Sequence, residues 1–524
     1  MLFISGGEVL MKKSKEQEKK GKSSGINGVM KSSFTGSILL IILLSLILSG
    51  GVIAFLIRAG AFAGTVHESS STGNTSNGTT ESTGIAPTDE DELFSKNDYL
   101  IGSGSEKIRF WSYTTEELDM IRQFVQQNPE FGEKYTIEFT VISGTPGTYQ
   151  SYLNKALEEG LDAPDIYATE EDFVLTYSQG DMAKYAAAYS ELGIDVDRKV
   201  KEADIVKYIT EVGSRDGEIV ALSYQSTGSA MIYNSDIAKE VFGTDDPDAI
   251  EKIIGANTGK WDKFLEAAAR LKEKGYAAVS GPGDIWNACW RSADTPWIVD
   301  GKISIDPKRA EYLSIAKTLK DNDYSNGSLQ WGDTWHSDIM GQGRRKVFAF
   351  FGPSWFINYT LMFTSEIGKT DGSFGKWRVC APPQVFFWGG TWIFANKDTK
   401  QKEGVAQLIE WITLDTSQDG LQYKLANGLL YSDGDPTKPI RKETVASATV
   451  MAVSDGKMDS CGGQNVFPIF IAANQSASFR SKSLYDNLIN EYYSRAVDLY
   501  AEGKVDRAGA IDAFKKSVKE NVGF

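Results

Sequence analysis

The chain has 524 residues and a net charge of −15, from 70 acidic and 55 basic side chains. This length suits two or three domains. The acidic balance argues against a nucleic-acid partner, because the phosphates of nucleic acids are bound by Lys and Arg. With only three cysteines and two histidines, the chain lacks the closely spaced ligands of a zinc site. We therefore expect no metal and no cofactor.

The first apolar feature is the stretch 36–57, which has 22 residues and no charge. It is long enough to cross the ~30 Å hydrocarbon core of a bilayer as one helix. Seven lysines precede this stretch, and only Arg58 follows it directly. The positive-inside rule therefore makes residues 1–35 a cytoplasmic basic tail and 36–57 a transmembrane anchor, with the rest of the chain outside the cell membrane.

The alternative to an anchor is a signal segment that is cleaved near Ala63, because 61–63 reads Ala-Phe-Ala and fits a signal peptidase site. No cysteine follows the apolar run, which excludes lipid attachment through a lipobox. Residues 58–105 are expected to form a flexible linker, since 68–86 consists mostly of Ser, Thr, Gly and Asn and has little to bury.

Strand and helix patterns alternate at the start of the folded region, residues 106–524. Strands are predicted over 107–111, 135–142 and 163–168, with helices beginning near 114 and over 149–159. Thr114 and Glu117 have the spacing of a capping box at the start of the first helix. This order indicates an α/β fold with a parallel sheet covered by helices.

Polar and aromatic residues follow two of these predicted strands. Trp111 and Tyr113 end the first strand, and Glu170 and Glu171 follow the third. In open parallel sheets, ligands bind at the carboxyl ends of the strands. The topology therefore places these four residues together. Further strands are predicted over 216–222, 229–234 and 346–351, and helices over 260–274, 405–414 and 484–500.

Nine of the twelve tryptophans lie between Trp286 and Trp392. Their neighbours are often Asp, Asn and Gly, whereas a core is usually filled by Leu, Ile and Val because a buried indole N–H needs a partner. The cluster favours a concave site that grips something flat and partly apolar, such as a sugar ring. For any single tryptophan, a place in the core is an equal alternative.

The order of segments resembles the extracellular solute-binding proteins of carbohydrate ABC importers, the class that includes maltose-binding protein. The resemblance covers residues 106–524. It implies two α/β lobes of the periplasmic-binding-protein type (type II), joined by crossing strands and closing on a sugar. The segments that carry it are FWSYTTEE (110–117), APDIYATE (163–170), DGEIVALSYQSTGSAMIYNSDI (216–237), KWDKFLEAAARL (260–271), RRKVFAFFGPSW (344–355) and FFWGGTWIFANKDTKQKEGVAQLIEWIT (386–413).

The resemblance also implies the limits of the lobes and the residues of the site. Lobe 1 takes about 106–225 and 395–440, and lobe 2 about 226–394 and 441–524. No residue is expected to be catalytic. The expected ligand-binding residues are Trp111, Tyr113, Glu170, Glu171, Tyr224, Gln225, Thr227, Asp284, Trp286, Asn287, Trp290, Trp355, Trp388 and Trp392.

The function implied is that of a monomeric, non-enzymatic receptor that delivers a sugar, expected to be an oligosaccharide, to ABC permease subunits. Two alternatives stay open. A receptor of the same fold for a polyamine would suit the acids and aromatics of the segments named above. A surface glycoside-active enzyme would need two carboxylates about 5–9.5 Å apart, for which Glu170, Glu171 and Asp284 are available. The state of the thiols of Cys289, Cys380 and Cys461 and the identity of the sugar stay open as well.

Overall fold

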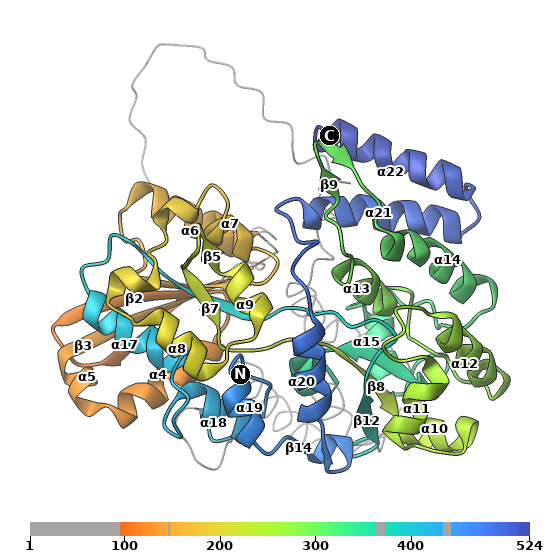
Figure 1. Cartoon of the computed structure of the whole chain (residues 1–524), viewed down its shortest axis with the longest axis horizontal. Helices are drawn as coiled ribbons and strands as arrows, with labels where there is room; N and C mark the ends of the chain where they lie inside the picture. The colour runs from red at the N-terminus through yellow and green to blue at the C-terminus, as the bar shows by residue number, and fades with distance from the viewer. Residues whose placement is uncertain (1–94, 145–146, 362–372, 433–441) are drawn as a thin grey trace, which may run out of the picture.

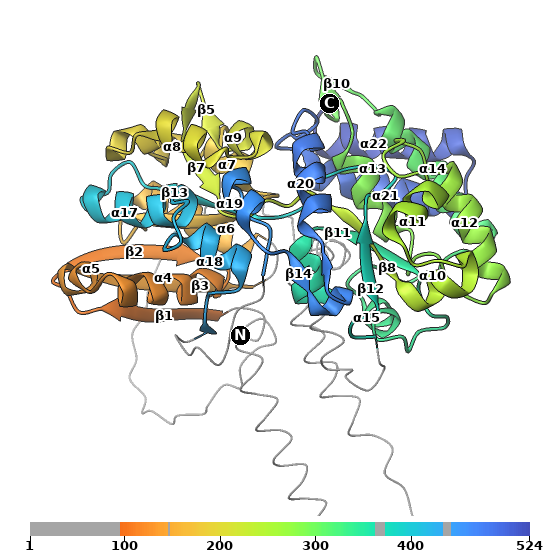
Figure 2. The same ribbon diagram turned by 60° about the horizontal axis from the view of Figure 1, so that its bottom comes forward.

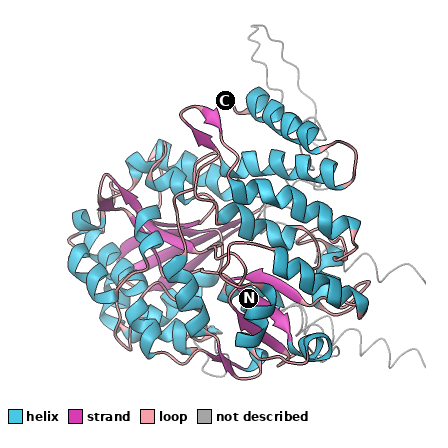
Figure 3. Cartoon of the chain, turned by 45° about the vertical axis from the view of Figure 1, so that its right-hand side comes forward, coloured by secondary structure: helices cyan, strands magenta, loops and turns pink. Residues whose placement is uncertain are grey.

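The computed structural model describes residues 95–144, 147–361, 373–432 and 442–524 (Figure 1). The predicted basic tail, the apolar run and most of the linker lie outside these residues. Within the described ranges, no helix is long and apolar enough to cross a bilayer. The described chain forms two lobes side by side (Figures 1 and 2), in which helices surround the strands (Figure 3).

The first lobe is built on a six-stranded sheet in the order β1-β3-β2-β4-β13-β7. Strand β2 pairs in parallel with both β3 and β4, which confirms the predicted parallel arrangement. Strands β1 and β13 run antiparallel to their neighbours. The strands are β1 (Ser95–Gly102), β2 (Glu106–Ser112), β3 (Tyr135–Ser143), β4 (Ile166–Glu170), β7 (Ala221–Ser223) and β13 (Thr391–Ala395).

Strand β1 corrects the predicted end of the linker, because 95–102 belongs to the sheet. It pairs with β3 from Ser95, opposite Ser143, to Gly102, opposite Thr136. As an edge strand it exposes most of its side chains. Its sequence therefore lacks the apolar alternation that reveals a strand with one buried face.

Helices cover this sheet, and the longest of them bury one apolar side. In α4 the buried residues include Leu118, Ile121 and Phe124, spaced three apart along one face. The helices of the lobe are α4 (Glu116–Gln127), α5 (Pro129–Lys134), α6 (Thr148–Glu159), α7 (Val174–Ser178), α8 (Val196–Ala203), α9 (Lys207–Val212), α17 (Lys402–Thr413), α18 (Leu421–Asn427) and α19 (Ala448–Val453).

The second lobe has a smaller antiparallel sheet in the order β11-β8-β12. Its strands are β8 (Ala230–Asn234), β11 (Ala349–Gly352) and β12 (Trp377–Cys380). Helix α10 begins directly after β8, where the Asn234 side chain accepts hydrogen bonds from the backbone N–H groups of Asp236 and Ile237. The helices are α10 (Ser235–Phe242), α11 (Pro247–Ile254), α12 (Asp262–Glu273), α13 (Gly283–Arg291), α14 (Pro307–Asp321), α15 (Asp333–Ile339), α20 (Phe467–Ser476), α21 (Asp486–Ala501) and α22 (Arg507–Asn521).

Two segments cross between the lobes and lie side by side. The first, 224–229, connects β7 to β8, and the second, 386–390, connects β12 to β13. They pair through the bonds from Ser229 N to Phe386 O (2.9 Å) and from Trp388 N to Thr227 O (3.1 Å). The pairing of β13 with β4 and β7 places 391–394 in the sheet of the first lobe, whereas the resemblance assigns these residues to the second.

A third segment, 443–446, runs along the other side of the first crossing. Ser226 N donates to Thr444 O (3.2 Å), and Ala446 N donates to Tyr224 O (2.9 Å). We call these three segments the hinge. Helix α20 lies against it (Figures 1 and 2), where the Asn474 side chain accepts a hydrogen bond from Gly228 N (2.6 Å).

Candidate functional site

Four charged side chains join the lobes next to the hinge, and we call them the interlobe ion cluster. Glu171 and Asp172 follow β4 in the first lobe. Arg291 ends α13 in the second lobe, and Lys482 precedes α21. Arg291 and Lys482 each pair with Glu171, and they contact Asp172 at 3.1 and 3.5 Å. The exposed fractions of the Glu171, Arg291 and Lys482 side chains are 1%, 3% and 8%, so the cluster is buried.

The charges of this cluster stabilise one another against the cost of burial. Burial opposes the ionisation of Asp172, yet the Arg291 and Lys482 charges hold the pKa of its carboxyl below the usual value. Burial likewise opposes the charge on Arg291, and the carboxylates of Glu171 and Asp172 still raise its pKa. Gly389 N also donates to Glu171 (3.2 Å), which connects the cluster to the hinge.

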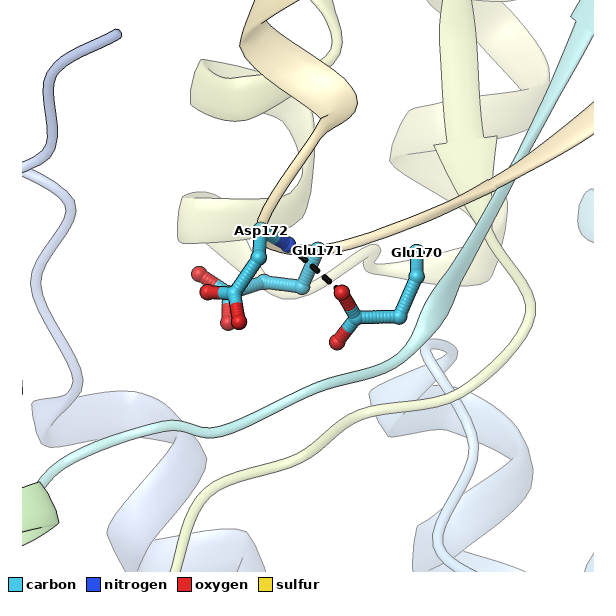
Figure 4. A group of neighbouring side chains, drawn as sticks. All are labelled: Glu170, Glu171 and Asp172. Carbon is cyan, nitrogen blue, oxygen red and sulfur yellow. Dashed lines mark hydrogen bonds between the residues drawn. The ribbon is translucent and has the colours of Figure 1, made fainter. Parts of the chain in front are cut away.

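Glu170, Glu171 and Asp172 together offer carboxylate oxygens that lie within 4.8 Å of one another, as a cation site would require. Glu171 and Asp172 turn their carboxylates to the same side, and Glu170 accepts a hydrogen bond from Asp172 N (3.0 Å) (Figure 4). The ammonium of Lys482 and the guanidinium of Arg291 already neutralise two of the three carboxylates. The arrangement is therefore that of an ion-pair cluster between lobes, and it needs no added metal.

An aromatic group, Trp331, Trp355, Phe356 and Trp388, lies beside this cluster. The rings of Trp355 and Trp388 have centroids 5.0 Å apart, and those of Trp331 and Trp388 5.9 Å. The Arg291 guanidinium lies 5.9 Å from the Trp388 ring. Trp331 and Trp355 are half-buried, whereas Phe356 is fully buried and Trp388 is 8% exposed. Two indoles therefore present part of their surface next to the hinge.

Two backbone features hold the aromatic group in place. Trp331 has a φ of +69°, which is unfavourable for a bulky residue and recurs at binding sites. Gly389 and Gly390 have φ of +74° and +106°. A Cβ on Gly389 would approach Nε1 of Trp355 to 3.2 Å, and that nitrogen donates to Trp388 O (3.0 Å). Glycine at 389 thus allows the Trp355 indole to pack directly on the hinge.

On the side of the hinge towards the first lobe, three carboxyl groups come together, those of Glu116, Glu117 and Glu443. Gln225 Nε2 donates to both Glu116 Oε1 (3.2 Å) and Glu443 Oε2 (2.9 Å). Ser112 Oγ donates to Glu117 Oε2 (2.8 Å). We call these three residues the carboxyl cluster. The predicted capping box is not formed, because the Glu117 carboxylate points to Ser112, and Thr114 Oγ1 instead accepts from Glu116 N (3.3 Å).

Burial dominates the proton affinity of these acids. It raises the pKa of Glu117 and of Glu443 to about 7. The pKa of Glu116 is raised well above its usual value by burial and by the negative charges of Glu443 and Glu117. Burial, together with Asp172 and Glu171, also raises the pKa of Glu170. A cation or a hydrogen-bond donor that joins such acids favours their ionised form and lowers their pKa.

Tyr113 connects the two acidic groups. Its hydroxyl exchanges a hydrogen bond with Thr391 Oγ1 (2.7 Å). Burial raises its pKa, and the charges of Glu170 and Glu117 add to the rise, so the phenol stays neutral and lies between these carboxyls. The hinge thus carries a continuous row of groups: ion cluster, Glu170, Tyr113 and carboxyl cluster.

Residues 126–428 match the family model of the bacterial extracellular solute-binding proteins. The chain belongs to this family. A comparison with the curated proteins finds no match in sequence. Its fold is shared with solved solute-binding proteins, and the predicted α/β class and two-lobed architecture are confirmed.

Three solved structures illustrate the shared fold of this solute-binding protein. A structure described as an extracellular solute-binding protein of family 1 has a TM-score of 0.63 at 15% identity and covers 79% of this chain and 99% of its own. The galacto-N-biose/lacto-N-biose I-binding protein of an ABC transporter from Bifidobacterium longum, in complex with lacto-N-biose, has a TM-score of 0.59 at 14% identity, with 80% and 98% covered. Maltose-bound MalE3 of T. maritima has a TM-score of 0.52 at 15% identity, with 79% and 99% covered.

Most residues predicted as ligand-binding lie on or beside the hinge of the solute-binding protein. Thr227 is buried and donates to Gly389 O (2.9 Å). Trp290 packs against the ion cluster, with Lys482 4.9 Å from its ring, and donates to Asn287 Oδ1 (3.2 Å). The residues that the structure brings together are Tyr113, Glu170, Glu171, Tyr224, Gln225, Thr227, Asn287, Trp290, Trp355 and Trp388.

Asp284 contacts the aromatic group indirectly, through Trp335. Its buried carboxylate accepts hydrogen bonds from Trp335 Nε1 (2.8 Å) and Gly281 N (3.0 Å). Burial raises its pKa to about 7. Since Trp335 packs against Trp331 with centroids 4.9 Å apart, Asp284 helps to hold the aromatic group.

Three predicted residues lie elsewhere. Trp286 packs between helices, against Tyr312 of α14 and Tyr493 of α21. Trp392 is fully buried in the first lobe. The Trp111 ring faces Lys96 of the edge strand β1 at 5.5 Å.

The predicted set lacks eight residues of the candidate site: Glu116, Glu117, Asp172, Arg291, Trp331, Phe356, Glu443 and Lys482. Glu116 and Glu117 look like ordinary first-turn acids of a helix. Glu443 and Lys482 are far from the other residues in the sequence, and only the folded chain brings them to the hinge. Trp331 did have a signal, namely its place in the tryptophan cluster.

Proposed function

We propose that this solute-binding protein is the receptor of an ABC importer and captures a sugar, specifically an oligosaccharide, at the hinge. One observation carries the proposal: the half-buried indoles of Trp331 and Trp355 lie beside Trp388 and the carboxylates that follow β4. Indole faces stack on the apolar C–H faces of sugar rings. Carboxylates such as Glu170 accept hydrogen bonds from the hydroxyls, each worth roughly 1.5–3 kcal/mol when one partner is charged.

The transport signal comes from the relative position of the lobes. Arg291 and Lys482 belong to the second lobe and Glu171 to the first, so the ion cluster forms only when the lobes are closed. A ligand that contacts both lobes favours the closed form by its differential affinity for it. A permease that binds the closed form then receives a loaded receptor.

We further propose that the apolar run 36–57 anchors the receptor, as a monomer, with its lobes outside the cell. The alternative is release after cleavage near Ala63. Fractionation of cells followed by mass spectrometry of the mature N-terminus distinguishes the two, because a cleaved chain lacks residues before Gly64 and leaves the membrane fraction.

Binding is tested by titrating the purified full chain with a panel of mono- and oligosaccharides and recording the unfolding temperature. A ligand at 100 times its Kd adds about 2.7 kcal/mol of stability. We expect a rise with one class of glycan. Trp355→Ala should abolish it, while Trp286→Ala should preserve it. The absence of any rise across the panel contradicts the proposed function, and chromatographic detection of cleaved glycan would favour an enzyme instead.

A further inference from the structure

The carboxyl cluster differs from the ion cluster in having no basic partner among the described residues. Glu171 and Asp172 are neutralised by Arg291 and Lys482. Throughout the described parts of the chain, no Lys, Arg or His forms an ion pair with Glu116, Glu117 or Glu443. Of the two acidic groups on this hinge, one is therefore paired with cations and the other has none among the described residues.

The cluster also contains an acceptor atom without a donor. Glu443 is 1% exposed, and among the described residues nothing donates a hydrogen bond to its buried Oε1. Gln225 Nε2 donates to its other oxygen (2.9 Å), and the side chains of Asn358 and Tyr359 also hydrogen-bond to this carboxyl. Buried polar atoms are almost always paired in native proteins. An unpaired acceptor within a group of three acids therefore indicates a site for an external hydrogen-bond donor.

The N-terminus of helix α4 explains only part of the cluster. Glu116 and Glu117 lie in its first turn, where the helix dipole stabilises negative charge. Glu443 comes from the third segment of the hinge and receives no such support. Proton uptake reduces the repulsion among the three carboxyls, in line with the raised pKa of each.

We propose that Glu116, Glu117 and Glu443 form a subsite for a protonated primary amine, so that the cargo carries an ammonium group beside its stacking surface. This inference rests on the proposed function, because it concerns the same hinge site. An ammonium group has three donors and no acceptor, which suits three carboxyls whose donors among the described residues are all uncharged. Glu116 is half-buried, so the subsite is open on that side. Among the described residues, three phenols border the subsite. Tyr113 lies near Glu117, Tyr224 donates to Glu117 (3.4 Å), and the 47% exposed Tyr359 lies beside Glu116 and Glu443.

Two sources share this chemistry, an amino sugar and a polyamine. Calorimetric titration of the full chain in detergent separates them, with glucosamine and galactosamine oligomers, their N-acetylated counterparts, neutral maltotriose and spermidine as probes. We expect an amino-sugar oligomer to bind about 10- to 100-fold more tightly than its N-acetylated form, as the loss of a charged hydrogen bond implies. Binding of the amino-sugar oligomer should release protons from the carboxyl cluster. The affinity for the oligomer should rise from about pH 5.5 to about pH 7 as the carboxyls ionise.

The variants Glu443→Gln and Glu116→Gln should each remove this preference for the free amine. The matched control is Glu130→Gln, since Glu130 is exposed on α5 and should not affect binding. The unfolding temperature of each variant, measured without ligand, shows that it is folded. In a folded Glu443→Gln variant, an undiminished preference for the amine contradicts the subsite.

The remaining outcomes distinguish this inference from the proposed function. If neutral or acetylated glycans bind as tightly as the free amines, the amine subsite is wrong and the sugar receptor stands. If spermidine binds and no glycan does, the amine subsite stands and the sugar receptor is wrong. If no probe binds, both are wrong.

Discussion

The substitution Glu443→Gln measures how much the buried charge of the carboxyl cluster destabilises the folded chain. The pKa of Glu443 is raised by burial from 4.5 to about 7, so the folded chain binds a proton more tightly than the unfolded chain. The contribution of this group to stability therefore falls as pH rises from 4.5 to about 7. At high pH the cost is on the order of 3 kcal/mol at most, since each tenfold change in proton affinity corresponds to about 1.36 kcal/mol.

Glutamine has the shape of the protonated acid and can still accept the hydrogen bond from Gln225. We therefore expect Glu443→Gln to stabilise the ligand-free protein by about 1–3 kcal/mol at about pH 8 and by less than about 1 kcal/mol at about pH 5. Urea denaturation of wild type and variant at both pH values measures the difference. Equal stability changes at the two pH values, or destabilisation at pH 8, would refute the reasoning about burial and repulsion.

Three further predictions concern the indoles, the ion cluster and the hinge turn. Trp355→Ala should weaken glycan binding about 10-fold or more, because it removes a stacking face, whereas Trp286→Ala should leave the Kd within threefold (about 0.6 kcal/mol); titration calorimetry decides this. Arg291→Met should cost about 3–5 kcal/mol of unfolding free energy, because it leaves Glu171 and Asp172 with Lys482 as their one basic partner among the described residues. The exposed control Lys107→Met should cost less than about 1 kcal/mol; equal losses in denaturant melts would contradict the importance of burial. Gly390→Ala should cost about 1–3 kcal/mol, because φ at this position is +106°; an unchanged melting temperature would show that the turn adapts.

The sheet of the first lobe was predictable because its central strands are buried. β2, β3 and β4 alternate with helices along the chain, and their apolar and β-branched residues indicate strands. Strand β1 was not predictable, because its edge position leaves its polar side chains in water. The sequence signal of a strand is the apolar alternation that comes from burial of one face. An edge strand such as β1 buries few side chains, so its sequence shows little of this alternation.

The site was predictable only where local sequence determines it. Trp355 after Gly352-Pro353 and Trp388 before Gly389-Gly390 stand at turns, and the structure brings both to the hinge. Trp286 has equally polar neighbours, yet it packs between helices. Lys482 and Glu443 gain their roles from contacts that join distant parts of the chain, and no local pattern indicates such contacts.

The position of the carboxyl cluster on the hinge has a kinetic consequence. In a rotation, each atom moves in proportion to its distance from the axis. Gln225 and Glu443 lie on the hinge segments, so a rotation of the lobes about these segments should change their contact little. Glu171 belongs to the first lobe and its partners Arg291 and Lys482 to the second, so these pairs must break if the lobes separate. In the proposed receptor, we therefore expect the carboxyl cluster to govern the association rate and the ion cluster the residence time.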